Sequence, residues 1–288
     1  MKILILGADG MIGHKMAQSL SYFDLYLNSR SHSNYLQEHF PNSTFLNFDF
    51  LNQNIEDLLE KTVPDFIINA VGITIRRGAS DNDETNLINS QLPKKIDFWC
   101  QENQKKQIHF STDCVFSGNK GNYNDLDLPN AKDDYGKSKG EGELNSNSTL
   151  TIRSSMIGRE IYNKTELLEW VISNKNNKIK GFDNVIYSGV TTLWMSYTVN
   201  EIIKNHPDLN GIYNISSPAI SKYDLITKIN TYFNLNIEIE MDSSYYSNKS
   251  LNSNKFFSET NFKKPNWDGM LNDLYLDSEK NKNLYNLT

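Results

Sequence analysis

The N-terminal stretch Lys2-Ile3-Leu4-Ile5-Leu6-Gly7-Ala8-Asp9-Gly10-Met11-Ile12-Gly13 decides the fold of this chain. A short run of branched apolar residues, as expected of a buried parallel strand, leads directly into a glycine-rich turn. A helical pattern follows through Leu20. Strand, glycine turn and helix in this order are the context in which such a glycine motif indicates dinucleotide binding.

Each glycine of this motif has its own predicted role. Gly7 allows the tight turn, Gly10 lets the backbone approach a pyrophosphate, and Gly13 lets the helix pack closely on the strand. The phosphates lie at the start of the helix, where free N–H groups and the helix dipole favour anions, so Met11 and Ile12 also belong to the predicted cofactor site. The alternative is a plain strand-to-helix turn without a ligand.

Further apolar runs predict four more strands, and helical patterns lie between them. The strands are expected at Leu25–Asn28, Thr44–Phe48, Phe66–Asn69 and Gln107–Phe110, and the helices at Ile55–Lys61 and Asn86–Cys100. This alternation implies right-handed βαβ crossovers and a parallel sheet. The predicted fold class is therefore α/β, a doubly wound parallel (Rossmann) sheet with a smaller α/β substrate lobe.

The end of the second strand bears on the choice of cofactor. An acid there would accept the ribose 2′-hydroxyl of NAD, whereas an arginine can pair with the 2′-phosphate of NADP. The strand ends at Ser29-Arg30-Ser31 and no acid follows it. Arg30 favours NADPH, with NADH as the alternative; Arg30 could also be a solvated side chain without a ligand.

In a doubly wound sheet, ligands bind beyond the carboxyl ends of the strands. Asp49 is placed to meet an adenine amino group, and the small residues after the fourth strand would let backbone pass against a cofactor. The remaining cofactor candidates at this edge are Asp49, Phe50, Ala70, Val71, Gly72, Asn89 and Ser111.

Two nearby stretches carry candidate catalytic residues. Ser111-Thr112-Asp113-Cys114-Val115-Phe116 follows the fifth strand, and Asp134-Tyr135-Gly136-Lys137-Ser138-Lys139 comes about two dozen residues later. On a helix, Lys139 would share a face with Tyr135 and favour the ionised form of the phenol, as a general acid near neutral pH requires. Such an acid would give its proton to a carbonyl oxygen of the substrate, and the Thr112 hydroxyl could hold that oxygen. The alternative is a surface Tyr and Lys that share a helix by chance.

Length and composition exclude several classes of protein. The 288 residues suffice for a sizeable core and two lobes, and the net charge of −6 lacks the basic excess of a general nucleic-acid binder. Two cysteines favour a reducing compartment, and no apolar run is long enough for a membrane helix or a signal-peptide core. We expect a cytoplasmic protein that binds neither membrane nor nucleic acid. No cluster has metal-ligand spacing.

Taken together, the motifs resemble an extended short-chain dehydrogenase/reductase, and within it the dTDP-4-dehydrorhamnose reductase branch. The resemblance rests on the three glycines and on Ser111-Thr112-Asp113-x-Val115-Phe116-x-Gly118, Tyr135-Gly136-x-Ser138-Lys139, Gly142-Glu143 and Arg153. The matching motifs are frequent over residues 1–160 and fewer in the rest of the chain.

The resemblance implies an NADPH-dependent reduction of a 4-keto-6-deoxy nucleotide sugar in deoxysugar or surface polysaccharide biosynthesis. Thr112, Tyr135 and Lys139 would be the catalytic set, with Tyr135 protonating the C4 oxygen and Lys139 holding the nicotinamide ribose. A homodimer is common in this superfamily. Two departures from the family pattern bear on which sugar is bound: Cys114 replaces the usual tyrosine, and Val71-Gly72-Ile73-Thr74 replaces an alanine-rich sequence.

The chain is expected to divide into two domains. Residues 1–155 and about 185–205 would form the dinucleotide-binding domain, and about 156–184 and 206–288 the substrate domain. Within the latter, Ser221 is expected to cap a helix and Asn234–Met241 to form a strand. The candidate substrate contacts are Thr74, Cys114, Val115, Met156, Ser188, Thr191, Asn252 and Lys255.

Three other functions are alternatives to the reductase. A 4,6-dehydratase of this superfamily carries a second acid after the threonine, and Cys114 occupies that place here. An epimerase or epimerase-reductase would need further groups that move protons at carbon; Cys114 could be one, or it could be a packing residue. A non-catalytic nucleotide-binding regulatory subunit would be expected to lose part of the catalytic set, which this chain retains.

Overall fold

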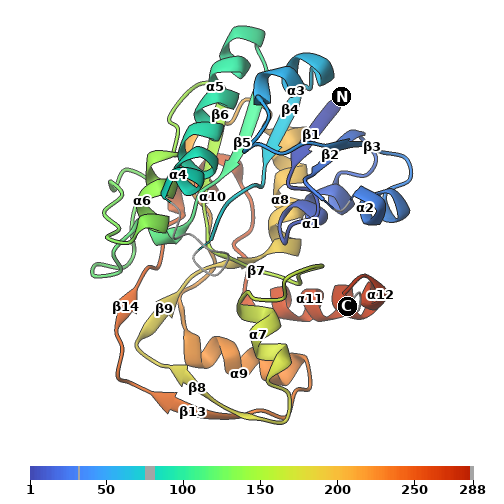
Figure 1. Ribbon diagram of the computed structural model, residues 1–288. Coiled ribbons are helices and arrows are strands. Elements are labelled where there is room, and N and C mark those ends of the chain that lie inside the picture. The colour runs from blue at the N-terminus through green and yellow to red at the C-terminus, as the bar shows by residue number, and fades with distance from the viewer. Residues whose placement is uncertain (32, 75–81, 286–288) are drawn as a thin grey trace. The chain divides into compact units, whose positions relative to one another are not determined.

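The computed structural model describes residues 1–31, 33–74 and 82–285 (Figure 1). Its internal contacts divide the chain into two compact units. Unit 1 comprises Met1–Val115, Pro129–Arg153 and Ser196–Tyr213, and unit 2 comprises Phe116–Leu128, Ser154–Met195 and Asn214–Thr288.

Unit 1 is built on a seven-stranded sheet. In spatial order its strands are β11 (Gly211–Asn214), β6 (Thr149–Arg153), β5 (Lys106–Phe110), β4 (Phe66–Asn69), β1 (Lys2–Leu6), β2 (Asp24–Ser29) and β3 (Thr44–Asn47). The pairs from β6 to β3 are all parallel. From β1 the strands β2 and β3 are added toward one edge of the sheet, and β4, β5 and β6 are added toward the other. This strand order confirms the predicted doubly wound fold.

Helices cover both faces of this sheet because its central strands are apolar on both sides. Unit 1 contains α1 (Gly13–Ser19), α2 (Ser33–His39), α3 (Ile55–Thr62), α4 (Asn82–Asn86), α5 (Leu92–Asn103) and α6 (Asp134–Glu141), and the division between the units falls within α8 (Thr192–Asn205). Leu4 and Ile67 pack in one core with Leu59 of α3 and Ile96 of α5. Among the described residues, no helix is both long enough and apolar enough to cross a membrane.

Unit 2 has shorter elements. Its strands are β7 (Met156–Ile157), β8 (Lys178–Phe182), β9 (Val185–Tyr187), β10 (Val190–Thr191), β12 (Ile220–Ser221), β13 (Glu238–Asp242) and β14 (Ser247–Asn248). They form the small sheets β10-β7, β12-β9-β14 and β13-β8. The helices are α7 (Leu167–Ser173), α9 (Lys222–Tyr232), α10 (Asn254–Thr260), α11 (Trp267–Lys280) and α12 (Lys282–Tyr285). Ser221 caps α9 as expected, since its hydroxyl accepts from the Asp224 N–H at 2.9 Å.

Several elements differ from the sequence-based expectation. The strand expected at Asn234–Met241 begins only at Glu238, because Asn234 and Asn236 adopt positive φ angles of 51° and 53°. The helix expected over Asn86–Cys100 is interrupted by a π-helical turn, Leu87–Gln91, before α5 starts beside Pro93.

The unit boundaries also lie elsewhere than expected. Residues 116–128, 154–155 and 185–195 fall in unit 2. Residues 206–213 fall in unit 1, because β11 adds to the edge of the large sheet beside β6. The assignment of cofactor binding to one domain and substrate binding to the other stays a prediction.

Gly13 gives a direct test of the packing between β1 and α1. A Cβ at this position would lie 2.0 Å from the Gly7 carbonyl oxygen and 2.8 Å from the Ala8 Cα, both backbone atoms. We expect Gly13→Ala to lower the free energy of unfolding in urea by about 1–3 kcal/mol or more. Gly10→Ala is the matched control, because its nearest atom would be the Gly7 oxygen at 3.2 Å. Equal stability of the two variants would contradict this packing.

Candidate active site

The glycine turn lies beside the exit of β4. Gly7 has a φ of +73°, and a Cβ there would lie 3.2 Å from the Val71 Cγ2 and 3.4 Å from the Ala70 carbonyl oxygen. The structure therefore brings these three predicted cofactor residues together at the carboxyl edge of the sheet. This is the switch point at which doubly wound folds bind their ligands.

Sequence reasoning missed Asn28, a buried residue that fixes the glycine turn. Its side-chain amide donates to the Phe48 carbonyl at 3.1 Å, and its Oδ1 accepts from the Gly7 N–H at 3.4 Å. The amide thus ties the turn after β1 to the end of β3. The available signal was a polar residue near the end of an otherwise apolar strand.

The start of α1 fits an anionic group. Gly10 donates to the Gly7 carbonyl at 3.0 Å and closes the turn. Within the described ranges, the N–H groups of Met11 and Ile12 make no hydrogen bond. Unpaired N–H groups at a glycine turn, with no side chain on Gly10, are the features that a pyrophosphate requires.

The candidates after β2 and β3 differ in their surroundings. Arg30 is exposed. The Asp49 carboxylate is engaged in its own turn, where it accepts from the Leu51 N–H at 3.1 Å and from the Asn52 amide at 2.8 Å. Phe50 packs against Phe48 with 5.5 Å between the ring centroids.

Asn89 is fully buried and links two parts of the site. Its Oδ1 accepts from the Ile73 N–H at 2.9 Å, and its Nδ2 donates to the Ile73 carbonyl at 3.0 Å and to the Ser138 hydroxyl at 3.1 Å. Gly72 lies next to the same Oδ1, at 3.6 Å from where its Cβ would be. In this structure Asn89 fastens the exit of β4 to α6, so its side chain is committed to protein contacts.

Helix α6 places the predicted catalytic tyrosine and lysine. Asp133 caps the helix by accepting from the Gly136 N–H at 2.8 Å. Gly136 packs so closely that a Cβ would lie 2.3 Å from the Cys114 carbonyl oxygen. The absence of a side chain at this position lets the first turn of α6, with the half-buried Tyr135, rest on the turn that follows Thr112.

Lys139 makes a second contact, between α6 and the end of β5. Its ammonium donates to the Phe110 carbonyl at 2.7 Å, at the last residue of β5, and the side chain is buried. Thr112 follows two residues later; its hydroxyl accepts from the Cys114 N–H at 3.1 Å and donates to Asp113 at 3.2 Å. Contacts on both sides of Thr112 therefore hold the face of α6 that carries Tyr135 and Lys139.

Burial controls the charge of the lysine. It lowers the pKa of Lys139 to about 8, and the nearby Glu143 carboxylate acts against this shift. A lysine with such a pKa is poised to change protonation close to physiological pH, which is a property of functional sites as well as of buried ion-pair networks.

Glu143 itself is held by two other groups. Its carboxylate accepts from Arg153 Nε at 2.8 Å and Nη2 at 2.7 Å, and from the Ser111 hydroxyl at 2.6 Å. The Arg153 and Glu143 side chains are only 2% and 4% exposed. This buried pair joins the end of β6, the segment after α6 and the residue before Thr112. Ser111, predicted to contact the cofactor, is one of its members.

His109 lies in the same region and stays neutral. The Val71 N–H donates to Asn69 Oδ1 at 3.3 Å, which leaves the Asn69 Nδ2 to donate to His109 Nδ1 at 3.3 Å. That nitrogen is therefore an acceptor, and the ring proton sits on Nε2. Burial, and then the Lys139 charge, hold the pKa of His109 well below its usual range.

The candidate substrate residues fall into two groups. Thr74, Cys114 and Val115 belong to unit 1, where Thr74 and Cys114 are half-buried and Val115 is buried. The Val115 carbonyl accepts from the Asn130 and Ala131 N–H groups at 2.9 Å. Cys114 and Val115 therefore lie on the same turn as Thr112.

In unit 2, backbone and side-chain contacts gather the other candidates. The Ser188 hydroxyl accepts from the Leu251 N–H at 2.9 Å, beside Asn252. Asn252 Oδ1 accepts from the Asn254 N–H at 3.0 Å, at the start of α10, where Lys255 lies.

Met156 and Thr191 lie on the paired strands β7 and β10, in which Met156 is aligned with Val190. The Thr191 hydroxyl accepts from the Trp194 N–H at 3.2 Å and thereby caps the start of α8. The ligand-binding roles of all these residues stay predictions.

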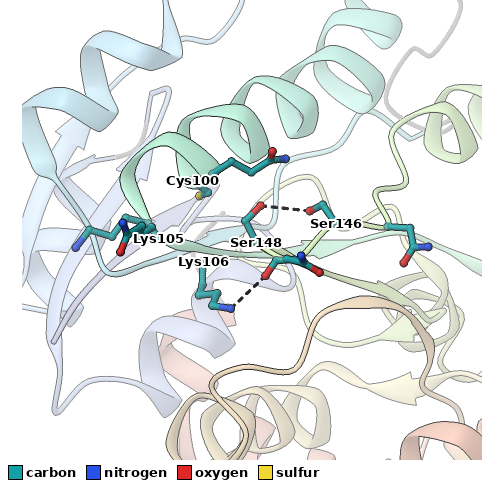
Figure 2. Close-up of a pocket in the computed structure, with 9 residues that line it drawn as sticks. Cys100, Lys105, Lys106, Ser146 and Ser148 are labelled. Carbon is teal, nitrogen blue, oxygen red and sulfur yellow. Dashed lines mark hydrogen bonds between the residues drawn. The ribbon is translucent and has the colours of Figure 1, made fainter.

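A separate groove of about 560 Å³ lies at the amino ends of β5 and β6, away from the carboxyl ends that carry the candidate site (Figure 2). It is lined by Cys100, Gln101, Gln104, Lys105, Lys106 and residues 145–148. Lys105 pairs with Asp65 at 2.9 Å, and Lys106 donates to the Asn147 carbonyl at 3.1 Å. Both ammonium groups are thus engaged, and no predicted site residue lines this groove. Among the described residues, no three His, Cys, Asp or Glu side chains are grouped to hold a metal ion.

Comparison with known proteins identifies relatives of this arrangement. The family model described as the RmlD substrate binding domain matches residues 1–164. The probable low-salt glycan biosynthesis reductase Agl14 of Haloferax volcanii is 32% identical over 93 residues, which is 32% of this chain and 31% of that protein. The alignment with this relative thus spans less than a third of its length.

Solved structures match nearly the whole chain. A hypothetical dTDP-4-dehydrorhamnose reductase from Sulfolobus tokodaii has a TM-score of 0.78 at 25% identity, covering 94% of this chain and 99% of that one. The dTDP-4-dehydrorhamnose reductase of Bacillus anthracis, in complex with NADP, has a TM-score of 0.76 at 20% identity, covering 96% and 99%. The second likeness shows the fold alone.

The buried Glu143–Arg153 pair predicts strongly non-additive stability effects. Removing one partner leaves the other charge buried without its counter-charge in this pair, so Arg153→Met and Glu143→Gln should each lower the free energy of unfolding by about 3–5 kcal/mol. The double variant should lose much less than the sum. Urea denaturation of the four proteins measures this coupling; additive losses would show that the pair does not act as a unit.

The lowered pKa of Lys139 predicts a pH-dependent stability. The unfolded chain keeps this lysine protonated up to about 10.5, whereas the folded protein releases the proton near 8. Between these values the unfolded chain binds more protons, so the folded state gains stability as the pH rises. Compared with Lys139→Met, the wild type should gain up to about 3 kcal/mol across this window. Urea denaturation at pH 7 to 10 measures it, and a constant difference would argue against a depressed pKa.

Proposed function

Because the chain belongs to the RmlD substrate binding domain family, as a dTDP-4-dehydrorhamnose reductase-like oxidoreductase of the extended short-chain dehydrogenases/reductases, we propose that it reduces a 4-keto-6-deoxy nucleotide sugar with NADPH. The observation that carries the proposal is the anchoring of α6, with Tyr135 and Lys139, on the two sides of Thr112. A reductase needs a proton donor held at this edge of the sheet.

The residues at the strand ends fit a nicotinamide dinucleotide. The unpaired N–H groups of Met11 and Ile12 would receive the pyrophosphate, and the backbone at Ala70 would flank the cofactor, as the close approach of Gly7 to this segment allows. Bound NADPH supplies the hydride. Arg30, exposed after β2, would pair with the 2′-phosphate.

The chain's own residues would control the proton. Tyr135 would donate it to the sugar's C4 oxygen, and the Thr112 hydroxyl would hold that oxygen. A charged Lys139, held by the Phe110 carbonyl, would favour the ionised form of Tyr135 after the transfer and would bind the nicotinamide ribose. Because the pKa of Lys139 is about 8, this support would weaken at pH values above that.

The nucleotide part of the substrate would be bound by unit 2. Ser188 and Asn252 lie close together through the Ser188–Leu251 hydrogen bond, and Met156 and Thr191 lie on adjacent strands. The dTDP-sugar named for the solved relatives and the glycan biosynthesis named for the curated relative support a role in deoxysugar or surface polysaccharide biosynthesis.

Tyr135→Phe tests the role of the proton donor. This variant keeps the ring and removes the hydroxyl, so we expect dinucleotide binding to change little while turnover falls by about 10²-fold or more. The assay follows loss of NADPH absorbance with a panel of 4-keto-6-deoxy nucleotide sugars. Tyr123→Phe is the control, because that phenol accepts backbone N–H groups of Gly118 and Lys120 within unit 2. Undiminished turnover of Tyr135→Phe would remove Tyr135 from this role.

A further inference from the structure

The glycine turn places the side chain of an acid at the end of β2, although the residues directly after β2 in the sequence include no acid. Asp9, between Gly7 and Gly10, accepts a hydrogen bond on Oδ2 from the Ser29 hydroxyl at 2.9 Å. Ser29 is the last residue of β2. Asp9 is half-buried, and its Oδ1 accepts no hydrogen bond from residues within the described ranges.

The neighbouring cation does not neutralise this acid. Arg30 follows Ser29 directly and is exposed. Neither an ion pair nor a hydrogen bond joins the Arg30 guanidinium to any residue that the structure describes, Asp9 included. The end of β2 therefore presents a carboxylate and a guanidinium as two separate charges.

These charges have opposite effects on the two nicotinamide dinucleotides. In a doubly wound fold the adenosine ribose lies at the end of the second strand. A carboxylate there accepts hydrogen bonds from a 2′-hydroxyl and repels a 2′-phosphate, whereas a guanidinium attracts the phosphate. The Ser29 hydrogen bond fixes the Asp9 carboxylate at the end of β2.

We propose that Asp9 is a specificity-determining residue that opposes Arg30 at the ribose 2′-position and thereby lowers the preference of this chain for NADPH over NADH. This rests on the dinucleotide site proposed above. Arg30 supplies the affinity for the phosphate, Asp9 limits it, and Ser29 positions the Asp9 carboxylate. Cofactor choice then depends on two charges from different strand ends, one in the glycine turn and one after β2.

The test is a pair of dissociation constants, for NADPH and NADH, measured by calorimetry on the full chain without any sugar. Asp9→Asn should tighten NADPH relative to NADH by roughly tenfold, the effect of removing one unit of like charge near the protein surface. Arg30→Met should shift the ratio the other way. Ser29→Ala, which keeps both charges, should move the ratio in the direction of Asp9→Asn but less far.

Asp24→Asn is the matched control, because this exposed acid is the first residue of β2, at the opposite end of the strand from Ser29. Its NADPH-to-NADH ratio should equal that of the wild type. An unchanged ratio in Asp9→Asn, with both dinucleotides still bound, would overturn the proposal and leave the reductase function standing. Failure of the wild type to bind either dinucleotide would overturn both. A shifted ratio without reduction of any sugar would overturn the reductase function alone.

Discussion

The hydrogen bond from the buried Lys139 ammonium to the Phe110 carbonyl is the contact on which the candidate site depends. It joins α6 to the end of β5, where the chain enters the turn that carries Thr112. Placing an ammonium group in the interior is unfavourable, and the lowered pKa of about 8 is the measure of that penalty. Because the burial of Lys139 opposes folding, we explain its buried position by its role in the candidate site and not by a contribution to stability.

The surrounding charges keep Lys139 in that position. Glu143 lies four residues further along the chain and would be a natural partner for the lysine, yet it binds Arg153 and Ser111. Burial, and then the Lys139 charge, hold the pKa of His109 well below its usual range, so no second cation forms beside the ammonium. Each of these side chains is buried, and together they leave the Lys139 ammonium on the Phe110 carbonyl. Stability and function are thus linked through one small set of polar groups.

Much of this architecture could be predicted from the sequence because it follows from local patterns. The strand of residues 2–6, the glycine turn and the Tyr135–Lys139 spacing each depend on neighbours in the chain, and the parallel sheet follows from their alternation. Contacts between distant residues could not be predicted in this way. Asn28 donates a hydrogen bond to the end of β3. Asp9 of the glycine turn accepts a hydrogen bond from Ser29, so a carboxylate lies at the end of β2 although the sequence has no acid directly after that strand. Local backbone conformation also escaped prediction, as the late start of β13 after Asn236 shows.

In the proposed reaction, hydride passes from the nicotinamide to C4 of the sugar. Its most direct test uses NADPH carrying deuterium at the transferable position, incubated with the wild type and a 4-keto-6-deoxy nucleotide sugar in ordinary water, with the product examined by NMR. A reductase of this kind places deuterium at C4 of the product and nowhere else. A sugar recovered without deuterium, or one that exchanges hydrogen with solvent at another carbon while NADPH is unchanged, would contradict the reductase and favour an epimerase.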